Sequence, residues 1–360
     1  MPKAPRTPDT LRRALLAAPV ALALAAPALV SAQAAHPSVD LTNGPIKAKL
    51  WLPDETNGYY RAMRFDWSGS INSLTVGGHE YFGIWTPKTS PMDNDRIDGP
   101  VEDYWPLNYE AAKPGETFVK IGVGTLKKAD DTPYRFQVNY ERLDTGKWTV
   151  THGANWIEYR HVLNDPASGY GYIYTKRITL TPGKPQMTID HTVQNTGKQA
   201  IDTNVYNHGF FMMDRQPTGP DIKITFPFKP VAERDLGPAA KIEGNSIVYV
   251  KELVTNPPGP PLPPGAPRPP MDPNRPTGAQ SGIAGFSTTD VKDFDIRVEN
   301  TRTGAGLRLT SDVPLTRINY WSVRSTACPE AYVAVKTAPG QSTKWRLTYD
   351  FYSLKAAPTT

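Results

Sequence analysis

Alternation of apolar and polar side chains is the feature of this chain that most constrains its fold. Residues 46–52, Ile-Lys-Ala-Lys-Leu-Trp-Leu, place an apolar side chain at every second position. A period of two is typical of a strand with one buried face. After residue 35 no segment sustains the period of 3.6 residues that an amphipathic helix shows. The sequence therefore predicts an all-β protein.

Similar runs predict further strands along the rest of the chain. The segment 181–184, Thr-Pro-Gly-Lys, has turn composition and predicts a hairpin between two of them. A chain of this length can form one large antiparallel β-sandwich, and we expect a single domain over residues 35–360. The remaining predicted strands are 73–76, 118–123, 134–140, 157–162, 172–180, 186–193, 201–207, 221–226, 246–250, 294–298, 307–309, 317–323, 331–335 and 344–352.

The first 34 residues have the composition of a secretory signal. Arg12 and Arg13 end a basic region, 14–30 is rich in Ala and Leu, and Ala-Gln-Ala at 32–34 fits a cleavage site. The apolar run is too short to span a membrane. We therefore expect a periplasmic or secreted protein with no membrane insertion after cleavage, exported by either the general or the twin-arginine route.

The charge balance gives no indication of a polyanionic partner. The chain has 40 basic and 35 acidic residues, and removing 1–34 leaves 36 and 34. A net charge of +2 on so long a chain gives no support for binding to nucleic acid or to an anionic membrane.

Residues 256–276 interrupt the strand pattern. This segment contains 11 prolines in 21 residues. It has few backbone donors and little apolar surface, so a polyproline-like surface loop inserted in the sandwich is predicted. Recruitment of a partner by this loop is the alternative.

No pattern in the sequence predicts a metal or a cofactor. His152, His161 and His191 lie on separate predicted strands without zinc-site spacing. Phosphate loops, nucleophile elbows and dinucleotide fingerprints do not occur. Cys328 is the only cysteine, and beside Pro in a strand-like run it is more typical of a small buried apolar residue than of a nucleophile.

Two short blocks carry an imidazole and a carboxylate on predicted strands. The first is Tyr-Asn-His-Gly-Phe-Phe at 206–211, and the second is Cys-Pro-Glu-Ala-Tyr at 328–332. His208 and Glu330 together would be able to move protons at a sugar hemiacetal. Each residue also has a structural alternative: His208 as a partner of a backbone carbonyl, and Glu330 as a solvent-facing strand residue.

These blocks resemble the central and C-terminal strands of galactose mutarotases (aldose 1-epimerases). That family carries Asn-His-x-x-Phe at the position of 207–211, and its chain ends in a Glu on a strand, a Pro-Gly turn and a closing strand. Here the corresponding residues are Glu330, Pro-Gly at 339–340 and 345–351, Trp-Arg-Leu-Thr-Tyr-Asp-Phe. The resemblance implies a galactose mutarotase-like β-sandwich and anomer interconversion by acid–base ring opening.

The resemblance also implies roles for individual residues. His208 would be the general acid and Glu330 the general base, with Asn207 beside the acid and Arg64 in the place of a substrate-binding arginine. From the residues themselves, Asp214 or Asp221 is a candidate to keep His208 protonated. Like Arg64, Arg324 is a candidate for orienting hydroxyl groups.

Aromatic residues near strand ends provide candidate sugar-stacking surfaces. Trp67, Trp85 and Trp105 are as consistent with such a role as with packing in a sheet. Glu102 lies in an acidic pair with Asp103, and its alternatives are a solvated loop or a second carboxylate at a sugar site, as a glycosidase requires.

Three classes of function remain open from the sequence. The leading hypothesis is an isomerase acting on a free sugar or on the end of an oligosaccharide. A polysaccharide lyase or glycosidase on the same scaffold is the second, with Tyr104, Tyr206, Arg61 and Arg64 as candidate lyase residues. The third is a non-catalytic carbohydrate-binding protein. Function depends on the site and not on the scaffold, and the oligomeric state is left open.

Overall fold

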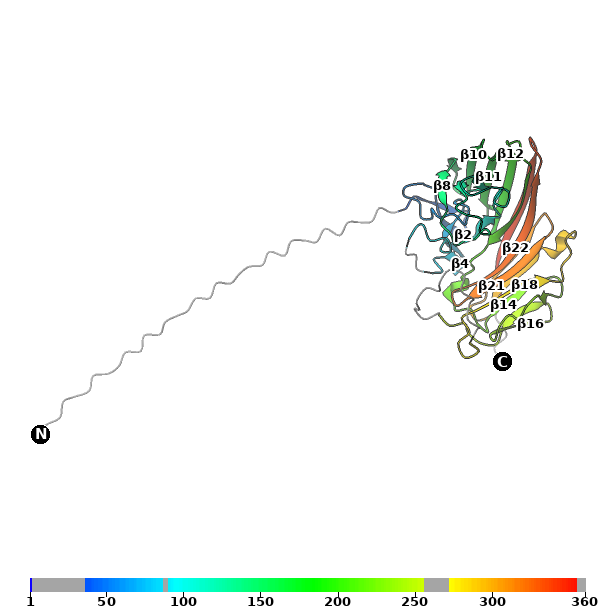
Figure 1. Ribbon diagram of the computed structural model, residues 1–360. Coiled ribbons are helices and arrows are strands. Elements are labelled where there is room, and N and C mark those ends of the chain that lie inside the picture. The colour runs from blue at the N-terminus through cyan, green and yellow to red at the C-terminus, as the bar shows by residue number, and fades with distance from the viewer. Residues whose placement is uncertain (2–35, 87–89, 256–271, 355–360) are drawn as a thin grey trace. The chain divides into compact units, whose positions relative to one another are not determined.

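The computed structural model describes Met1 and residues 36–86, 90–255 and 272–354. The described residues from His36 onward form one compact unit, shown in Figure 1. Its helical content in the described ranges is two short 3-10 turns, η1 (Met213–Arg215) and η2 (Val291–Asp293). The strands are β1 (Ser38–Thr42), β2 (Ile46–Trp51), β3 (Ile71–Val76), β4 (His79–Gly83), β5 (Val101–Tyr104), β6 (Thr117–Lys120), β7 (Gly124–Lys127), β8 (Glu141–Asp144), β9 (Lys147–His152), β10 (Trp156–Asp165), β11 (Tyr170–Leu180), β12 (Gln186–Asn195), β13 (Ile201–His208), β14 (Ile222–Thr225), β15 (Val231–Ala232), β16 (Ala240–Glu243), β17 (Ser246–Tyr249), β18 (Gly278–Ala284), β19 (Asp295–Asn300), β20 (Ala305–Ser311), β21 (Arg317–Val323), β22 (Thr326–Thr337) and β23 (Ser342–Ser353).

Two large sheets carry the fold. The ten-stranded sheet has the order β16-β17-β14-β19-β20-β23-β12-β11-β10-β9, and the six-stranded sheet has the order β15-β18-β21-β22-β13-β5. Neighbouring strands in both are antiparallel. Two smaller sheets, β1-β2-β3-β4 and β6-β7-β8, complete the unit.

The long hairpins of the ten-stranded sheet follow directly from the alternation in the sequence. Strands β10, β11 and β12 bury every second side chain. The turn between β11 and β12 is closed by a bond from the backbone N–H of Thr181 to the carbonyl of Gln186, and Gly183 has a φ of 69°. The hairpin predicted at 181–184 is therefore present.

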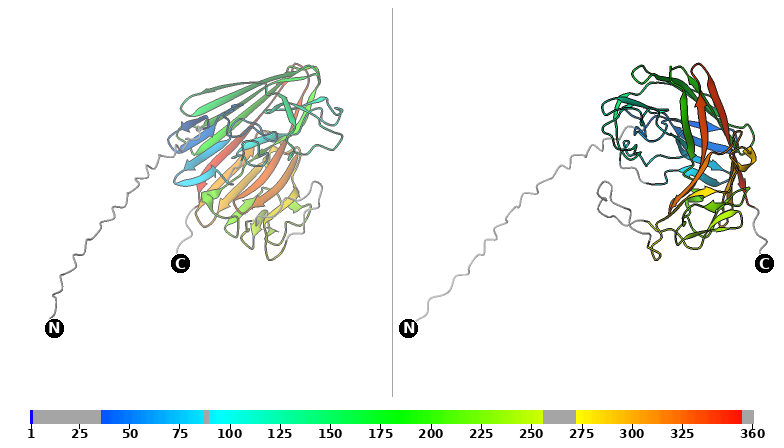
Figure 2. Two further views of the ribbon diagram at one scale, coloured as in Figure 1. Left: turned by 60° about the vertical axis from the view of Figure 1, so that its left-hand side comes forward. Right: turned by 45° about the vertical axis from the view of Figure 1, so that its right-hand side comes forward.

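The two large sheets face each other across a common core. Strand β22 contacts both β12 and β23 of the other sheet, and Figure 2 shows these orange, green and red strands side by side. Buried apolar side chains from both sheets form one cluster, including Ile189 and Leu347 from one sheet and Val205 and Val333 from the other. Burying such side chains from two facing sheets is the main stabilising term of a sandwich. The predicted all-β sandwich is confirmed.

Two strand predictions differ from the structure. The predicted strand 118–123 extends past the end of β6 at Lys120, and 121–123 form the turn before β7. Residues 134–140 form turns rather than a strand, although their sequence alternates. Tyr140 is buried against Tyr109 and Phe118, and Tyr134 packs on the same group, so packing of their rings produces this alternation without sheet pairing. The predicted signal at 1–34 and the part of the Pro-rich segment up to residue 271 lie outside the described residues.

In the parts of the chain that the structure describes, no helix has the length and apolar character needed to cross a membrane.

Candidate functional site

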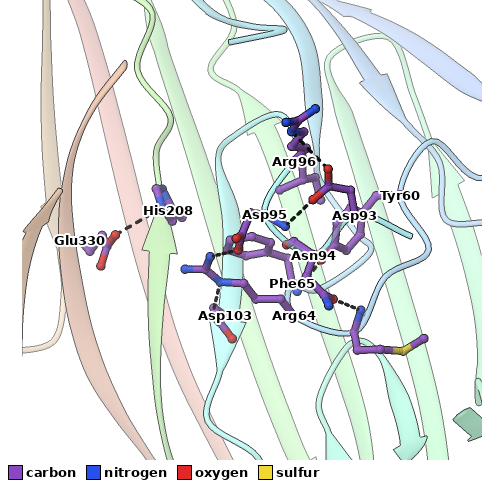
Figure 3. Close-up of polar contacts among 12 residues, drawn as sticks. Tyr60, Arg64, Phe65, Asp93, Asn94, Asp95, Arg96, Asp103, His208 and Glu330 are labelled. Atoms are coloured by element: carbon purple, nitrogen blue, oxygen red, sulfur yellow. Dashed lines mark hydrogen bonds and ion pairs between the residues drawn. The ribbon is translucent and has the colours of Figure 1, made fainter. Parts of the chain in front are cut away.

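His208 and Glu330, 122 residues apart in sequence, lie together on adjacent strands. Strand β13 pairs with β22 so that Asn207 is opposite Ala331, which places the next residues along each strand side by side. The Nε2 atom of His208 is 3.3 Å from Oε1 of Glu330, as Figure 3 shows. Both side chains are almost fully buried, so Glu330 does not face solvent.

This pair lines a cavity of about 700 Å³. Alternate residues of β13, namely Asn204, Tyr206 and His208, form one wall, since side chains two apart on a strand share a face. The volume is in the range of small-molecule sites. The other lining residues are Arg64, Trp85, Asp95, Asp103, Trp105, Tyr134, Phe136, Gln137, Phe210, Gln280, Thr316, Arg317, Asn319, Trp321, Glu330 and Tyr332.

Aromatic rings hold the imidazole of His208. Phe210 stacks on it with the ring centroids 3.6 Å apart, and Phe65 and Trp321 contact it edge to face. Phe210 has a φ of 45°, the left-handed region that costs energy for a bulky residue. That backbone turn directs the ring of Phe210 onto His208. Cys328 is buried in the same aromatic cluster, as its sequence context predicted.

A close backbone approach fixes the end of β13 beside the start of β5. A Cβ atom on Gly99 would collide with the carbonyl oxygen of Gly209. Only glycine permits this contact. It brings the loop before β5 against the residue that follows His208.

Burial sets the protonation of the pair. It raises the pKa of Glu330 from 4.5 to about 7, although a hydrogen bond from the Asn319 amide to Oε2 (2.6 Å) and the charge of Arg64 oppose it. Burial, with Arg64 adding to it, lowers the pKa of His208 well below 6.5. Below about pH 7 these shifts favour a pair that holds one proton, on Glu330. They favour the reverse of the protonated His and ionised Glu expected from the sequence.

Arg64 lies on the cavity wall with its guanidinium already paired. It donates to Asp95 (2.5 Å), to Asp103 (3.1 Å) and to the hydroxyl of Tyr206 (2.9 Å), as Figure 3 shows for the two carboxylates. Lys120 also donates to Asp103 (2.8 Å). This network fixes Arg64 and Tyr206 on the wall next to the dyad, a rigid arrangement suited to reading hydroxyl groups.

Asn207 and Glu102 lie on the opposite side of the sheet, in the interior of the sandwich. The Asn207 amide donates to Oε1 of Glu102 (2.7 Å), and His191 Nε2 is 2.9 Å from the same oxygen. Lys176 pairs with the other carboxylate oxygen. Neither Asn207 nor Glu102 lines the cavity, which corrects the expectation that both touch substrate. Because neighbours on a strand face opposite ways, the cavity side chains are His208 and Asp103.

The remaining predicted binding residues also lie away from the cavity. Trp67 is buried and donates to the Ala62 carbonyl (2.9 Å). Asp214 bonds His79 (2.8 Å), and Arg324 pairs with Glu252 at the surface (2.8 Å).

The two carboxylates proposed to keep His208 protonated are engaged elsewhere. Asp214 bonds His79 as above, and Asp221 accepts from Arg302 (2.7 Å). Neither Asp214 nor Asp221 lines the cavity, so neither opposes the burial and the Arg64 charge that lower the pKa of His208.

Several wall residues were not assigned to this site from the sequence. Asn319 faces Glu330 because β21 pairs with β22 in that register, and Arg317 and Trp321 flank it at spacing two. Tyr206 was named only for a lyase, yet its position two residues before His208 on one strand predicts a shared face. No local signal marks Asn319, since strand pairing alone brings it to Glu330.

Among the described residues, no group of three or more His, Cys, Asp or Glu side chains could hold a metal ion. The cavity lining comprises the His–Glu pair, Arg64 with its paired carboxylates, Arg317, carboxamides, hydroxyl groups and aromatic rings. These groups supply proton transfer, hydroxyl recognition and stacking surfaces.

Comparisons with known proteins identify the fold. No family model matches the chain, and no curated protein sequence matches it. Among solved structures, a protein of Synechocystis sp. PCC 6803 aligns over 89% of this chain and 96% of its own, with 11% identity and a TM-score of 0.51. A galactose mutarotase-like protein from Clostridium acetobutylicum aligns over 89% and 97%, again with 11% identity and a TM-score of 0.51. At this level of identity the likeness concerns the fold, and this chain has the galactose mutarotase-like fold.

Proposed function

We propose that this protein is an aldose 1-epimerase-type isomerase that interconverts the anomers of a free sugar or of the reducing end of an oligosaccharide. The observation that carries the proposal is the His208–Glu330 pair, 3.3 Å apart on the wall of the cavity. Burial raises the pKa of Glu330 and lowers that of His208, which favours a pair that holds one proton up to about pH 7. Ring opening needs one acid and one base at adjacent oxygen atoms of the hemiacetal. A pair with one proton supplies both.

The reaction balances with these two side chains alone. Protonated Glu330 donates to the ring oxygen while neutral His208 accepts the proton of the anomeric hydroxyl, and the bond between the anomeric carbon and the ring oxygen breaks. Rotation of the resulting aldehyde presents its other face. Ring closure returns the proton from His208 to the new anomeric hydroxyl and the ring hydroxyl's proton to Glu330. No co-reactant is consumed.

The fixed polar groups around the pair fit a hydroxyl-rich ligand. Arg64 and Tyr206 are held by Asp103, so their positions are set before ligand binds. Trp85 and Trp321 add apolar surface beside them, and a pyranose ring has C–H faces that pack on such rings.

A polysaccharide lyase is the second candidate because Tyr206 and Arg64 both line the cavity. A lyase base must lose its proton, however, and burial raises the pKa of Tyr206 well above 10. Tyr104, the other candidate base, is buried in the core away from the cavity. The raised pKa of Tyr206 and the burial of Tyr104 therefore argue against a lyase. The position of Glu102 in the interior argues against a glycosidase that would use it as the second carboxylate.

Export through residues 1–34 remains part of the proposal.

The test is polarimetry on the purified protein with freshly dissolved α-D-glucose, α-D-galactose and other aldoses. Glu330→Gln and His208→Asn should each lower the catalysed rate about a hundredfold or more, because each removes one partner of the proton transfer. Both should still bind sugar, since the rest of the wall is intact.

Glu299→Gln and His79→Asn are matched controls. In the parent protein Glu299 accepts a hydrogen bond from Tyr352, and His79 pairs with Asp214 outside the cavity. Both should keep the parent rate. Parent protein that accelerates no aldose contradicts the proposal. Unsaturated products absorbing in the near ultraviolet, released from uronate polysaccharides, would favour the lyase.

A further inference from the structure

Trp105 is a large aromatic residue left half exposed on the wall of the cavity. Its relative exposure is 55%, the highest of any large apolar side chain in the described body of the chain from residue 36 onward. It directly follows β5 and lines the same cavity as the His208–Glu330 pair. An exposed indole is unremarkable when isolated, but this one borders a cavity.

The row of side chains on β13 gives the position of Trp105 relative to the dyad. The backbone N–H of Trp105 donates to the Asn204 carbonyl (2.9 Å), so it lies level with Asn204, four residues before His208. At the rise of a strand this separation is about 13 Å. A single pyranose ring at the dyad does not cover this distance along the strand, whereas a second linked ring extends from the dyad toward the exposed indole.

The cavity opens outward along this row. His208 and Tyr206 are buried, while Asn204 is exposed. The rim beside Trp105 thus faces solvent, and the dyad lies at the inner end. A chain of sugars entering from the rim would have its terminal unit at the dyad.

Trp105 is braced for contact with a flat ligand. Its ring meets Tyr134 edge to face at 5.3 Å, and Tyr134 stacks on Tyr140 at 5.7 Å. The Trp105 carbonyl accepts from the hydroxyl of Thr203 (2.8 Å). Asn204 and Gln137 are exposed on the same wall, and each carboxamide offers a donor and an acceptor for hydroxyl groups.

We propose that the cavity is built for an oligosaccharide, with an outer sugar-binding subsite formed by Trp105, Asn204 and Gln137. The reducing-end unit occupies the inner end at His208 and Glu330, and the next unit stacks on the indole. This inference rests on the proposed function for the orientation of the ligand. The volume of about 700 Å³ accommodates such a ligand.

Isothermal titration calorimetry on the full protein tests the subsite without requiring catalysis. Maltose, cellobiose and lactose, which all have glucose as the reducing-end unit, are each compared with glucose, and the quantity measured is the ratio of the glucose Kd to the disaccharide Kd. We expect a ratio of about ten or more for at least one disaccharide. Trp105→Ala should reduce it about tenfold, the upper end of aromatic contact energies, and Trp105→Phe should retain part of it.

Leu143→Ala is the control, because Leu143 is also half exposed but does not line the cavity; its ratio should equal the parent's. Far-ultraviolet circular dichroism and the urea midpoint establish that each variant is folded. Equal Kd values for all sugars, no disaccharide binding at millimolar concentration, or a Trp105→Ala ratio equal to the parent's would overturn the inference. A preserved disaccharide preference without any mutarotation would instead overturn the proposed reaction and leave the subsite standing.

Discussion

Two buried His–Glu pairs lie on opposite faces of the six-stranded sheet, and they differ in ways that separate structure from chemistry. In the interior pair, His191 is 2.9 Å from Glu102; in the cavity pair, His208 is 3.3 Å from Glu330. Each imidazole stacks on an aromatic ring, Trp345 and Phe210 respectively. Each carboxylate accepts from an asparagine amide. The local chemistry of the two pairs is nearly the same.

A lysine is the main difference between them. Burial alone would raise the pKa of Glu102, but Lys176 and His191 lower it to about 2. Among the described residues Glu330 forms an ion pair only with His208, and burial raises its pKa to about 7 against the opposing charges of Arg64 and Arg317. A buried carboxylate with a cation is a fixed ionic contact, while one without it keeps a transferable proton. The comparison therefore separates an interior pair whose carboxylate is bonded directly to a lysine from a cavity pair whose carboxylate is not bonded to a lysine or arginine in the described residues.

Removing the lysine should have the largest effect of the three changes that follow. The ammonium group of Lys176 pairs with Glu102 and lies 3.6 Å from Oδ2 of Asp66. Lys176→Met therefore leaves two buried carboxylates without their cation. An unpaired buried charge is costly, and we expect a loss of about 3–5 kcal/mol in the free energy of unfolding. Urea denaturation at pH 7 measures it.

The control for this change is Lys336→Met, which breaks an exposed pair with Asp202 (3.8 Å) and should cost less than about 1 kcal/mol. Equal effects of the two substitutions would mean that the interior pair is not held by its cation.

Exchanging Glu for Gln at the two sites should change stability in opposite directions. Between pH 4.5 and about 7 the unfolded chain has released the proton of Glu330 while the folded chain retains it, so stability from this group falls as pH rises. The free energy of unfolding of Glu330→Gln should therefore exceed that of the parent by up to about 3 kcal/mol at pH 8. For Glu102 the folded pKa of about 2 means that stability is present above pH 4.5 and falls as pH drops toward 2. The free energy of unfolding of Glu102→Gln should be about 3 kcal/mol lower than that of the parent at pH 8.

Urea unfolding of both variants and the parent at pH 5 and pH 8 makes this comparison. Glu243→Gln at an exposed position provides the reference and should differ from the parent by about 0.5 kcal/mol or less. The same sign for both substitutions at pH 8 would contradict the opposite protonation of the two pairs.

The pH dependence of the rate should show the smallest of these effects. The active form of the cavity pair holds one proton, and it loses that proton as pH rises through about 7. We expect kcat/KM to fall up to tenfold per pH unit above that value, about 1.4 kcal/mol per unit. Polarimetry from pH 5 to 9, corrected for the spontaneous rate, measures it.

His79→Asn should leave this pH profile unchanged, because its partner Asp214 is outside the cavity. A rate that rises through pH 7 and levels at high pH would show that the proton on Glu330 is not needed, and the assignment of the acid would fail.

Alternation in the sequence predicted much of the fold because a strand's side-chain period is local. Runs such as 172–180 and 186–193 match β11 and β12, with the hairpin turn between them. The same rule fails at 134–140, where aromatic packing produces alternation without a strand. Short strands such as β4 and β5 were missed because four or five residues carry too little pattern.

The sequence alone determined the β architecture, pointed to His208 and Glu330 as site residues through two motif blocks, and pointed to Arg64 only through the family resemblance. It did not distinguish neighbours that face opposite sides: Asn207 and Glu102 point to the interior, while His208 and Asp103 face the cavity. Strand pairing, which joins residues far apart in sequence, decided that Asn319 meets Glu330 and that Lys176 meets Glu102. The charge state of each pair follows from those contacts and from burial, and both are properties of the packed sheets.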